Sequence, residues 1–334
     1  MLLNKLRSPK FWNNKQSILS KCINPLAKLI NYIITIRNNS VISETVSVPV
    51  IGIDSVVISG AGKTPAIDLV CDLLKQLQYN PHILTSSHSG YIKNVVQVDP
   101  NLHSYLQVGD ESLLSAQVVP TWVGKNRIKA SKAAISAGAN VLIIDDWLKN
   151  NYLKQDIKIL VIDSKQMFGN GYLFPAGSLM YKIDTSITFA DLILIIGDYN
   201  EELENNIQSI KNSVPIFRAK MEAIEKVSVE NNKVIAFCGL GYPSKFKITL
   251  QECDYNIIDF LIFSDHHPYT ITEIQKLVNI AKNNNATLIT TTKDYVKIPD
   301  VFKSEIKTIE IKLNLENEDL INYFSNKLTD KSNI

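Results

Sequence analysis

Cysteines, long apolar runs and cleavage sites are scarce in this sequence of 334 residues, and each scarcity excludes a class of protein. The four cysteines show neither paired nor CxxC spacing, which argues against a disulfide framework or a zinc site and favours a reducing, cytosolic setting. Near the N-terminus, the longest nearly apolar run is residues 29–36, whereas a bilayer-spanning helix needs about 20 residues. No small-residue cleavage site follows this run, which argues against a secretory signal.

The composition that remains is that of an ordinary globular protein, with 45% hydrophobic and 20% charged residues. These proportions exclude collagen-like, coiled-coil and disordered chains. At roughly 100–200 residues per domain, the length predicts about two domains with a large core.

Acidic residues are absent before Glu44, although seven basic residues occur there. The basic residues are Lys5, Arg7, Lys10, Lys15, Lys21, Lys28 and Arg37. Apolar side chains and one cysteine recur in this stretch at spacings of three and four, which predicts one face of a helix. The residues of this stripe are Ile18, Cys22, Leu26, Leu29, Ile30 and Ile33. We interpret the arm as an amphipathic helix that lies among lipid head groups, with lysines on its flanks.

The aromatic pair Phe11 and Trp12 adds bulk that suits a membrane interface. The alternative is a helix that packs on the protein's own core and keeps its lysines in water. Nucleic acid is a poorer partner, because an arm that binds it would usually not be so rich in Ile and Leu. The arm therefore predicts a peripheral membrane contact and no nucleic-acid partner.

After the arm, short apolar runs alternate with helical patterns, which is typical of a parallel sheet covered by helices. The predicted strands are 56–58, 82–85, 141–144, 159–162 and 192–196, and the predicted helices are 65–78 and 127–137. Alternating segments at 214–219 and 224–229 predict a hairpin. A second α/β pattern then runs from a strand at 234–238 to a helix at 317–327.

The strongest local motif follows the first of these strands and precedes a helix, which is the setting of a phosphate-binding loop. Its residues are Val57, Ile58, Ser59, Gly60, Ala61, Gly62, Lys63 and Thr64. Glycines let backbone N–H groups approach phosphates, and the helix N-terminus adds partial positive charge. Lys63 can reach the β and γ phosphates of ATP, and the Thr64 hydroxyl can bind Mg²⁺. The alternative is a tight turn with a surface lysine.

This loop makes the expected fold an α/β P-loop kinase-type parallel sheet covered by helices, with a smaller C-terminal α/β lobe. The expected segments are a membrane-associated arm (1–38), a nucleotide-binding kinase domain (39–213), a hairpin linker (214–230) and a C-terminal lobe (231–334).

A metal-binding acid should follow a neighbouring apolar strand, and Asp145 and Asp146 come directly after the strand predicted at 141–144. Asp145 is the expected Mg²⁺ ligand, and Asp146 is expected to contact metal, water or substrate. The alternative for this acid pair is a helix cap or loop carboxylate.

Two further places carry candidate chemistry. Asp110 and Glu111 follow a glycine, and an Asp beside the γ-phosphate can accept the proton of an attacking hydroxyl. On spacing alone, such acids are more often first-turn carboxylates of a helix. His266 and His267 stand beside Asp265, where a histidine can orient a carboxylate in a cleft. Purely structural histidines remain the alternative.

Taken together, these residues resemble the tetraacyldisaccharide 4′-kinase family of lipid A biosynthesis. The matching segments, in the family's order, are residues 8–12, 59–65, 108–111, 168–177, 237–246, 265–269 and 291–294. Three segments depart from the family. Its Asp-Asp-Gly-Phe-Gln-His reads here as Asp-Asp-Trp-Leu-Lys-Asn from Asp145 onward. Its Ser-Arg-Gly-Tyr-Gly survives only as His-Ser-Gly-Tyr at residues 88–91, and its Pro-Leu-Arg-Glu reads Ser-Leu-Met-Tyr at residues 178–181.

The resemblance implies transfer of the γ-phosphate of ATP to the 4′-hydroxyl of an acylated glucosamine disaccharide 1-phosphate. It implies a peripheral enzyme at the cytoplasmic face of the inner membrane. It further implies that Asp110 takes the proton of the sugar hydroxyl and that His266 orients Asp110. Lys63 and Thr64 keep their phosphate and Mg²⁺ roles, and Asp145 keeps the metal role.

Three alternatives to a lipid kinase stay open at this point. A membrane-associated P-loop ATPase would need the loop and the basic arm but neither Asp110 nor His266. An inactive, kinase-derived binding module would fit the altered segment after Asp146. A small-molecule P-loop ligase is the third, although no additional substrate motif is visible.

Overall fold

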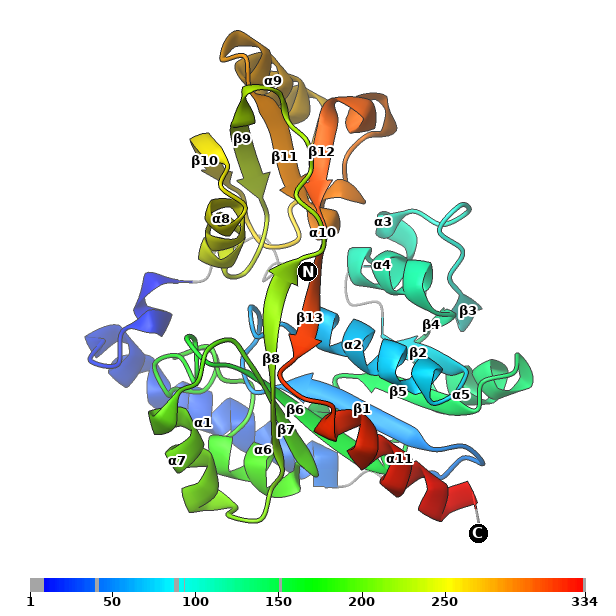
Figure 1. Ribbon diagram of the computed structural model, residues 1–334. Coiled ribbons are helices and arrows are strands. Elements are labelled where there is room, and N and C mark those ends of the chain that lie inside the picture. The colour runs from blue at the N-terminus through cyan, green and yellow to red at the C-terminus, as the bar shows by residue number, and fades with distance from the viewer. Residues whose placement is uncertain (1–8, 40–41, 87–89, 93, 150–151, 333–334) are drawn as a thin grey trace.

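The computed structural model describes residues 9–39, 42–86, 90–92, 94–149 and 152–332. Within these residues the chain forms two α/β lobes, each built on its own sheet, with the smaller lobe above the larger one (Figure 1). The sheet of the larger lobe has the strand order β13-β8-β7-β6-β1-β5-β2-β4-β3, and the smaller sheet has the order β10-β9-β11-β12. Lys5 and Arg7 of the basic arm lie outside the described residues.

The strands and helices of the larger lobe have the following bounds. The strands are β1 (Val50–Ser55), β2 (Pro81–Thr85), β3 (Val96–Gln97), β4 (Thr121–Val123), β5 (Val141–Asp145), β6 (Ile157–Asp163), β7 (Leu192–Ile196), β8 (Ile216–Ala223) and β13 (Ile311–Leu315). The helices are α1 (Ile18–Asn39), α2 (Lys63–Gln76), α3 (Tyr105–Val108), α4 (Asp110–Val118), α5 (Arg127–Ser136), α6 (Ile183–Phe189), α7 (Glu201–Ile210) and α11 (Asp319–Ser332). Short 3₁₀ turns lie at η2 (Lys10–Asn13) and η3 (Trp147–Lys149).

The C-terminal lobe is smaller and has four strands among the described residues. Its strands are β9 (Lys233–Cys238), β10 (Asn256–Ile262), β11 (Thr287–Thr291) and β12 (Ile306–Ile309). Its helices are α8 (Pro243–Glu252), α9 (Ile271–Asn283) and α10 (Thr292–Tyr295), with 3₁₀ turns at η4 (Glu230–Asn232) and η5 (Asp300–Glu305).

The large sheet is buried on both faces, as the apolar runs of the sequence predict. In β6, Ile159 and Val161 contribute to one core cluster, while Leu160 and Ile162 contribute to the cluster on the other face. The central strands β1, β5, β6 and β7 pair in parallel, so their carboxyl ends lie at one edge of the sheet. The predicted fold class is confirmed, and this edge is where functional residues should gather.

Three boundary predictions are wrong. The first strand is Val50–Ser55 rather than 56–58, because Asp54 and Ser55 are buried in β1 and make its pattern look polar. The hairpin at 214–230 does not form, because β8 pairs in parallel with β7 and antiparallel with the distant β13. The C-terminal lobe is shorter than the predicted 231–334. Its sheet ends with β12 at Ile309, because β13 and α11 return to the larger lobe.

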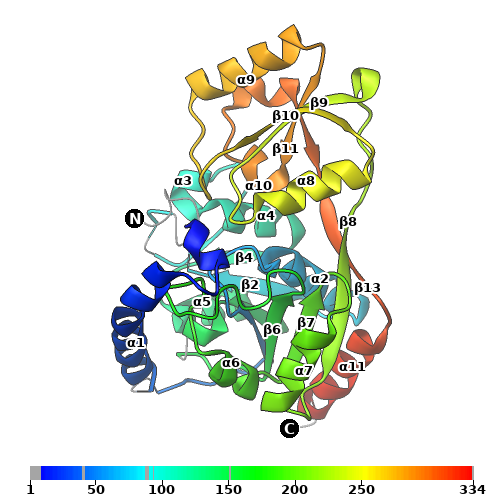
Figure 2. The same ribbon diagram turned by 90° about the vertical axis from the view of Figure 1, so that its left-hand side faces the viewer.

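The N-terminal helix α1 buries a side of small and polar residues with part of its isoleucines and exposes most of its predicted apolar stripe. Ser20 and Ala27 are fully buried, whereas Leu26, Leu29 and Ile33 are each more than half exposed. The helix does pack on the protein's own core through Ala27 and Ile23, while most of the predicted apolar stripe stays exposed. Helix α1 lies along one side of the larger lobe, at the left of Figure 2. Among the described helices, none is both long and apolar enough to cross a membrane.

Candidate active site

The phosphate loop connects β1 to α2 at the carboxyl edge of the large sheet. Gly60 and Gly62 both have φ of +88°, a left-handed conformation that L side chains rarely adopt. A Cβ on Gly62 would lie 2.6 Å from Ile196 Cδ1, so any side chain here would require a shift of Ile196 as well as a strained backbone. Pro65 stands in the first turn of α2, where its missing N–H removes no helical hydrogen bond. The loop therefore presents the N-terminus of a 14-residue helix to the edge of the sheet.

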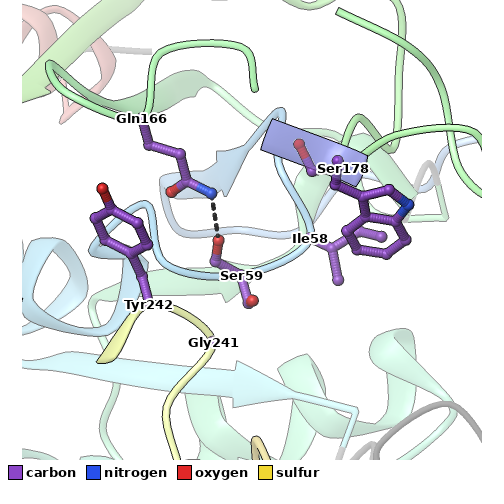
Figure 3. Close-up of a pocket in the computed structure, with 7 residues that line it drawn as sticks. Ile58, Ser59, Gln166, Ser178, Gly241 and Tyr242 are labelled. Atoms are coloured by element: carbon purple, nitrogen blue, oxygen red, sulfur yellow. Dashed lines mark hydrogen bonds between the residues drawn. The ribbon is translucent and has the colours of Figure 1, made fainter. Parts of the chain in front are cut away.

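Val57 and Ile58 lie before the loop proper. Val57 is 3% exposed, belongs to the core and forms a bridge with Leu179. Ile58 lines a cavity of about 20 Å³, which has room for about one water molecule. Trp12, Ser59, Gln166, Ser178, Gly241 and Tyr242 complete the lining, so this cavity joins the N-terminal segment, the loop and the C-terminal lobe (Figure 3).

Lys63 forms ion pairs with both acids that follow β5. Its Nζ lies 2.7 Å from Asp145 Oδ1 and also contacts Asp146 Oδ1. Burial lowers the pKa of Lys63, but the charges of Asp145 and Asp146 outweigh it and hold that pKa well above its ordinary value. Burial raises the pKa of Asp145 more than the charge of Lys63 lowers it. The lysine is thus held at the loop as a cation between two carboxylates.

Thr64 and Asp145 line one small cavity together with Glu111. We call Lys63, Thr64, Asp145 and Asp146 the Lys63 group. A hydroxyl and two carboxylates are hard oxygen donors of the kind that Mg²⁺ prefers. Across the described part of the chain, no three His, Cys, Asp or Glu side chains cluster as a complete metal site. The oxygen donors of the Lys63 group suit Mg²⁺, which usually takes one or two carboxylates and completes its shell with phosphates and water.

The Asp110–His266 pair joins the two lobes. Asp110 is the first residue of α4 and is 3% exposed, while His266 follows β10 in the C-terminal lobe. His266 Nδ1 lies 2.7 Å from Asp110 Oδ2. Burial raises the pKa of Asp110, but the hydrogen bond from His266 and the charges of Lys293 and Lys297 outweigh it and hold that pKa well below its usual range. Asp110 is therefore an ionised carboxylate at neutral pH.

Lys293, the second residue of α10, connects this pair to its surroundings. Its Nζ lies 3.1 Å from Glu111 Oε1, 3.4 Å from His266 Nε2 and 3.7 Å from Asp265 Oδ1. An ammonium group only donates, so Nε2 of His266 accepts and its Nδ1–H donates to Asp110. Because Glu111 also lines the cavity of Thr64 and Asp145, it links the Asp110–His266 pair to the Lys63 group.

Sequence reasoning missed several residues of this site. Lys293 lies in the matched segment 291–294 directly after β11, and that position at the end of a strand was the available signal. Arg127 is 3% exposed, its Nη2 lies 3.4 Å from the Asp145 carbonyl oxygen, and burial lowers its pKa to about 10. Gln166 and Lys245 contact the phosphate loop from elsewhere in the chain, and no local pattern marks them.

Comparison with known proteins decides the family. The sequence model of the family described as tetraacyldisaccharide-1-P 4′-kinase matches residues 19–329. The chain belongs to the tetraacyldisaccharide 4′-kinase family. It is 34% identical to the tetraacyldisaccharide 4′-kinase of Gluconobacter oxydans, covering 92% of this chain and 93% of that protein. The corresponding kinase of Paramagnetospirillum magneticum is 32% identical, covering 95% and 97%.

A solved structure shares the fold of this chain. LpxK from Aquifex aeolicus, crystallised in complex with ATP, superimposes with a TM-score of 0.71 at 24% identity. The match covers 93% of this chain and all of that chain. The enzyme is thus a tetraacyldisaccharide 4′-kinase of lipid A biosynthesis, a phosphotransferase with an alcohol acceptor. This result sets aside the membrane-associated ATPase and the small-molecule ligase.

The segment that follows Asp145 is built around Trp147. Its indole is 4% exposed and donates Nε1–H to the Ile159 carbonyl at 2.9 Å. The indole lies against Gly52 of β1, where an added Cβ would be 2.5 Å from Trp147 Cβ. Asp146, just before it, adopts a left-handed φ of +68°. Trp147 therefore packs beneath the Lys63 group rather than opening toward a ligand.

Proposed function

We propose that the Lys63 group binds the phosphates of ATP and that Asp110 accepts the proton of the 4′-hydroxyl as the γ-phosphate is transferred to it. The observation that carries this proposal is the 2.7 Å contact between Asp110 and His266 beside Glu111, which shares a cavity with Thr64 and Asp145. A base and a phosphate loop at one place are what phosphoryl transfer to an alcohol requires.

The residues divide the reaction between them as follows. Loop N–H groups and Lys63 hold the phosphates and offset the negative charge that spreads over the oxygens during transfer. Asp110 is ionised and therefore able to accept the hydroxyl proton as the oxygen attacks phosphorus. His266 holds the Asp110 carboxylate through Nδ1–H, and Lys293 holds His266 from the other side. Positioning thus supplies most of the catalysis, with one proton transfer at Asp110.

Mg²⁺ is the metal that this donor set suits. Thr64, Asp145 and Asp146 are the residues that would hold it, directly or through water. When bound, the ion neutralises charge on the β and γ phosphate oxygens. Since Lys63 contacts both Asp145 and Asp146, these acids also position the lysine.

We further propose that α1 places the enzyme at the cytoplasmic face of the inner membrane as a peripheral protein. Ile18, Leu26, Leu29, Ile33 and Ile36 are each more than half exposed to solvent. Such a stripe, flanked by lysines, gains free energy when it enters the headgroup region of an anionic bilayer. The acceptor is acylated, so a membrane-bound kinase meets its substrate where that lipid resides.

The test is a product assay with radiolabelled ATP and a tetraacyldisaccharide 1-phosphate in anionic vesicles. We expect a bisphosphorylated lipid from the wild type and a loss of about 10²–10⁴-fold in turnover for Asp110→Asn, with ATP affinity retained. Full turnover by Asp110→Asn would remove Asp110 from the mechanism. If the wild type hydrolyses ATP without forming labelled lipid, water rather than the sugar hydroxyl is the acceptor.

A further inference from the structure

Two consecutive carbonyl oxygens of the phosphate loop accept hydrogen bonds from side chains that the mechanism above does not use. Gln166 Nε2 donates to Ser59 O at 3.1 Å (Figure 3), and Lys245 Nζ donates to Gly60 O at 2.6 Å. Because a trans peptide group is planar, a carbonyl held on one side directs the following N–H to the other side. The two bonds therefore set the directions of the Gly60 and Ala61 N–H groups.

One carboxylate positions both donors. Asp163, at the end of β6, is 5% exposed. Its Oδ1 accepts from the backbone N–H of Lys165 at 3.1 Å and of Gln166 at 2.6 Å, while its Oδ2 lies 2.6 Å from Lys245 Nζ. Asp163 thus fixes the turn that carries Gln166 and pairs with the charge of Lys245. The loop carbonyls are held by a small network rather than by isolated contacts.

Lys245 reaches the loop from the other lobe. It lies on α8, which is anchored in the core of the C-terminal lobe by the buried side chains of Phe246 and Leu250. The Lys245 ammonium lies 5.8 Å from the centre of the Tyr242 ring, and a Cβ on Gly60 would be 2.9 Å from Tyr242 Cβ. The N-terminus of α8 therefore packs directly on the phosphate loop.

We propose that Lys245 is a positioning residue for phosphoryl transfer. By joining Asp163 to the Gly60 carbonyl, it holds the loop N–H groups in the orientation that binds nucleotide phosphates, and it makes that orientation depend on docking of the C-terminal lobe. Successive N–H groups held in this way form an anion-binding concavity that needs no rearrangement when phosphate arrives. This inference rests on the proposed role of the loop in binding ATP.

The main experiment replaces Lys245 by Met in the full-length enzyme and measures ATP affinity and both KM values. We expect ATP to bind about 10- to 100-fold more weakly, because a charge-assisted hydrogen bond and an ion pair are lost. The KM for the lipid acceptor should stay unchanged, which separates loop positioning from general loss of folded protein. Lys245→Arg should restore most of the affinity. Lys247→Met is the matched control, since Lys247 is exposed on the same helix.

A second variant tests whether Lys245 acts through the loop rather than on the phosphates directly. Asp163→Asn keeps a carbonyl oxygen for the Lys165 and Gln166 N–H groups but removes the charge that faces Lys245. We expect it to weaken ATP binding, and the Lys245→Met, Asp163→Asn double variant to lose little more than either single variant. Losses that add in full would overturn the proposal, as would wild-type ATP affinity in Lys245→Met.

Lys63→Ala separates failure of this inference from failure of the proposed function. If Lys63→Ala keeps full turnover, the loop is not the nucleotide site and both statements fall. If Lys63→Ala is inactive while Lys245→Met binds ATP as the wild type does, the loop assignment stands and the role of Lys245 is wrong.

Discussion

The Lys63 group and the Asp110–His266 pair are assembled in different ways. In the Lys63 group, Lys63 and Thr64 begin α2, which the phosphate loop joins to β1, and Asp145 and Asp146 lie at the end of β5, which pairs directly with β1. In the Asp110–His266 pair, one partner belongs to α4 of the larger lobe and the other to the C-terminal lobe. We infer that the Lys63 group comes from one lobe and receives only the support of Lys245 from the other, whereas the Asp110–His266 pair exists only when both lobes are in contact.

The largest loss of turnover should come from a substitution in the Lys63 group. Lys63→Ala removes a cation at the transferring group, so we expect its loss of turnover to exceed that of any other substitution considered, at more than about 10³-fold. Steady-state kinetics with the lipid acceptor measure this loss. Lys129→Ala, an exposed lysine of α5, is the control and should retain wild-type turnover. A milder loss in Lys63→Ala than in Asp110→Ala would reverse the comparison.

A substitution in the Asp110–His266 pair should slow phosphoryl transfer without weakening ATP binding. Asp110→Ala should lower turnover by about 10²–10⁴-fold while ATP binds with wild-type affinity, because Asp110 acts on the acceptor proton. Turnover assays and calorimetric titration with ATP separate the two quantities. Weak ATP binding in this variant would mean that the two ends of the site are not independent.

Membrane binding should be separable from the two parts of the active site, the Lys63 group and the Asp110–His266 pair. The double substitution Leu29→Glu, Ile33→Glu places charges on the exposed stripe of α1, so we expect binding to anionic vesicles to fall by about tenfold or more. Vesicle sedimentation measures it, and ATP affinity should not change. Val301→Glu, at a more exposed apolar residue of the C-terminal lobe, is the control. Equal losses in both variants would count against α1 as the membrane contact.

The smallest expected effect is on how thermal stability depends on pH. The pKa of Asp110 is lowered in the folded enzyme, so its stabilising contribution is full above the unfolded carboxyl pKa of about 3.9 and is lost as the pH falls through the lower folded value. Asp110→Asn should therefore lower the Tm by a few degrees, roughly, at pH 7. The gap to the wild type should close below about pH 4. A gap that does not depend on pH would show that the carboxylate charge is not the stabilising feature.

Local patterns predicted the parts of the site that lie within one stretch of chain. The glycine loop and Asp145 each follow an apolar strand, and parallel strands bring such ends together. The pairing of Asp110 with His266 was expected only from the family resemblance, because no local rule connects residues on separate lobes. Gln166 and Lys245 could not be predicted, since each contacts the loop through tertiary packing alone.

The N-terminal helix shows a different limit of prediction. Its apolar periodicity correctly predicted a face but left open whether that face turns inward or outward. The answer depends on Ser20 and Asn170, whose side chains hydrogen-bond at 3.0 Å beneath the helix. This buried hydrogen bond accompanies the packing of Ala27 and Ile23 against the core, and the periodicity of the apolar residues alone does not reveal it.

The packing of Trp147 on Gly52 limits the order in which these two positions can evolve. A Cβ at position 52 would lie closest to the Cβ of Trp147, so Gly52→Ala should clash with any side chain at position 147 and be tolerated only with glycine there. A lineage that gained this tryptophan is then committed to its glycine.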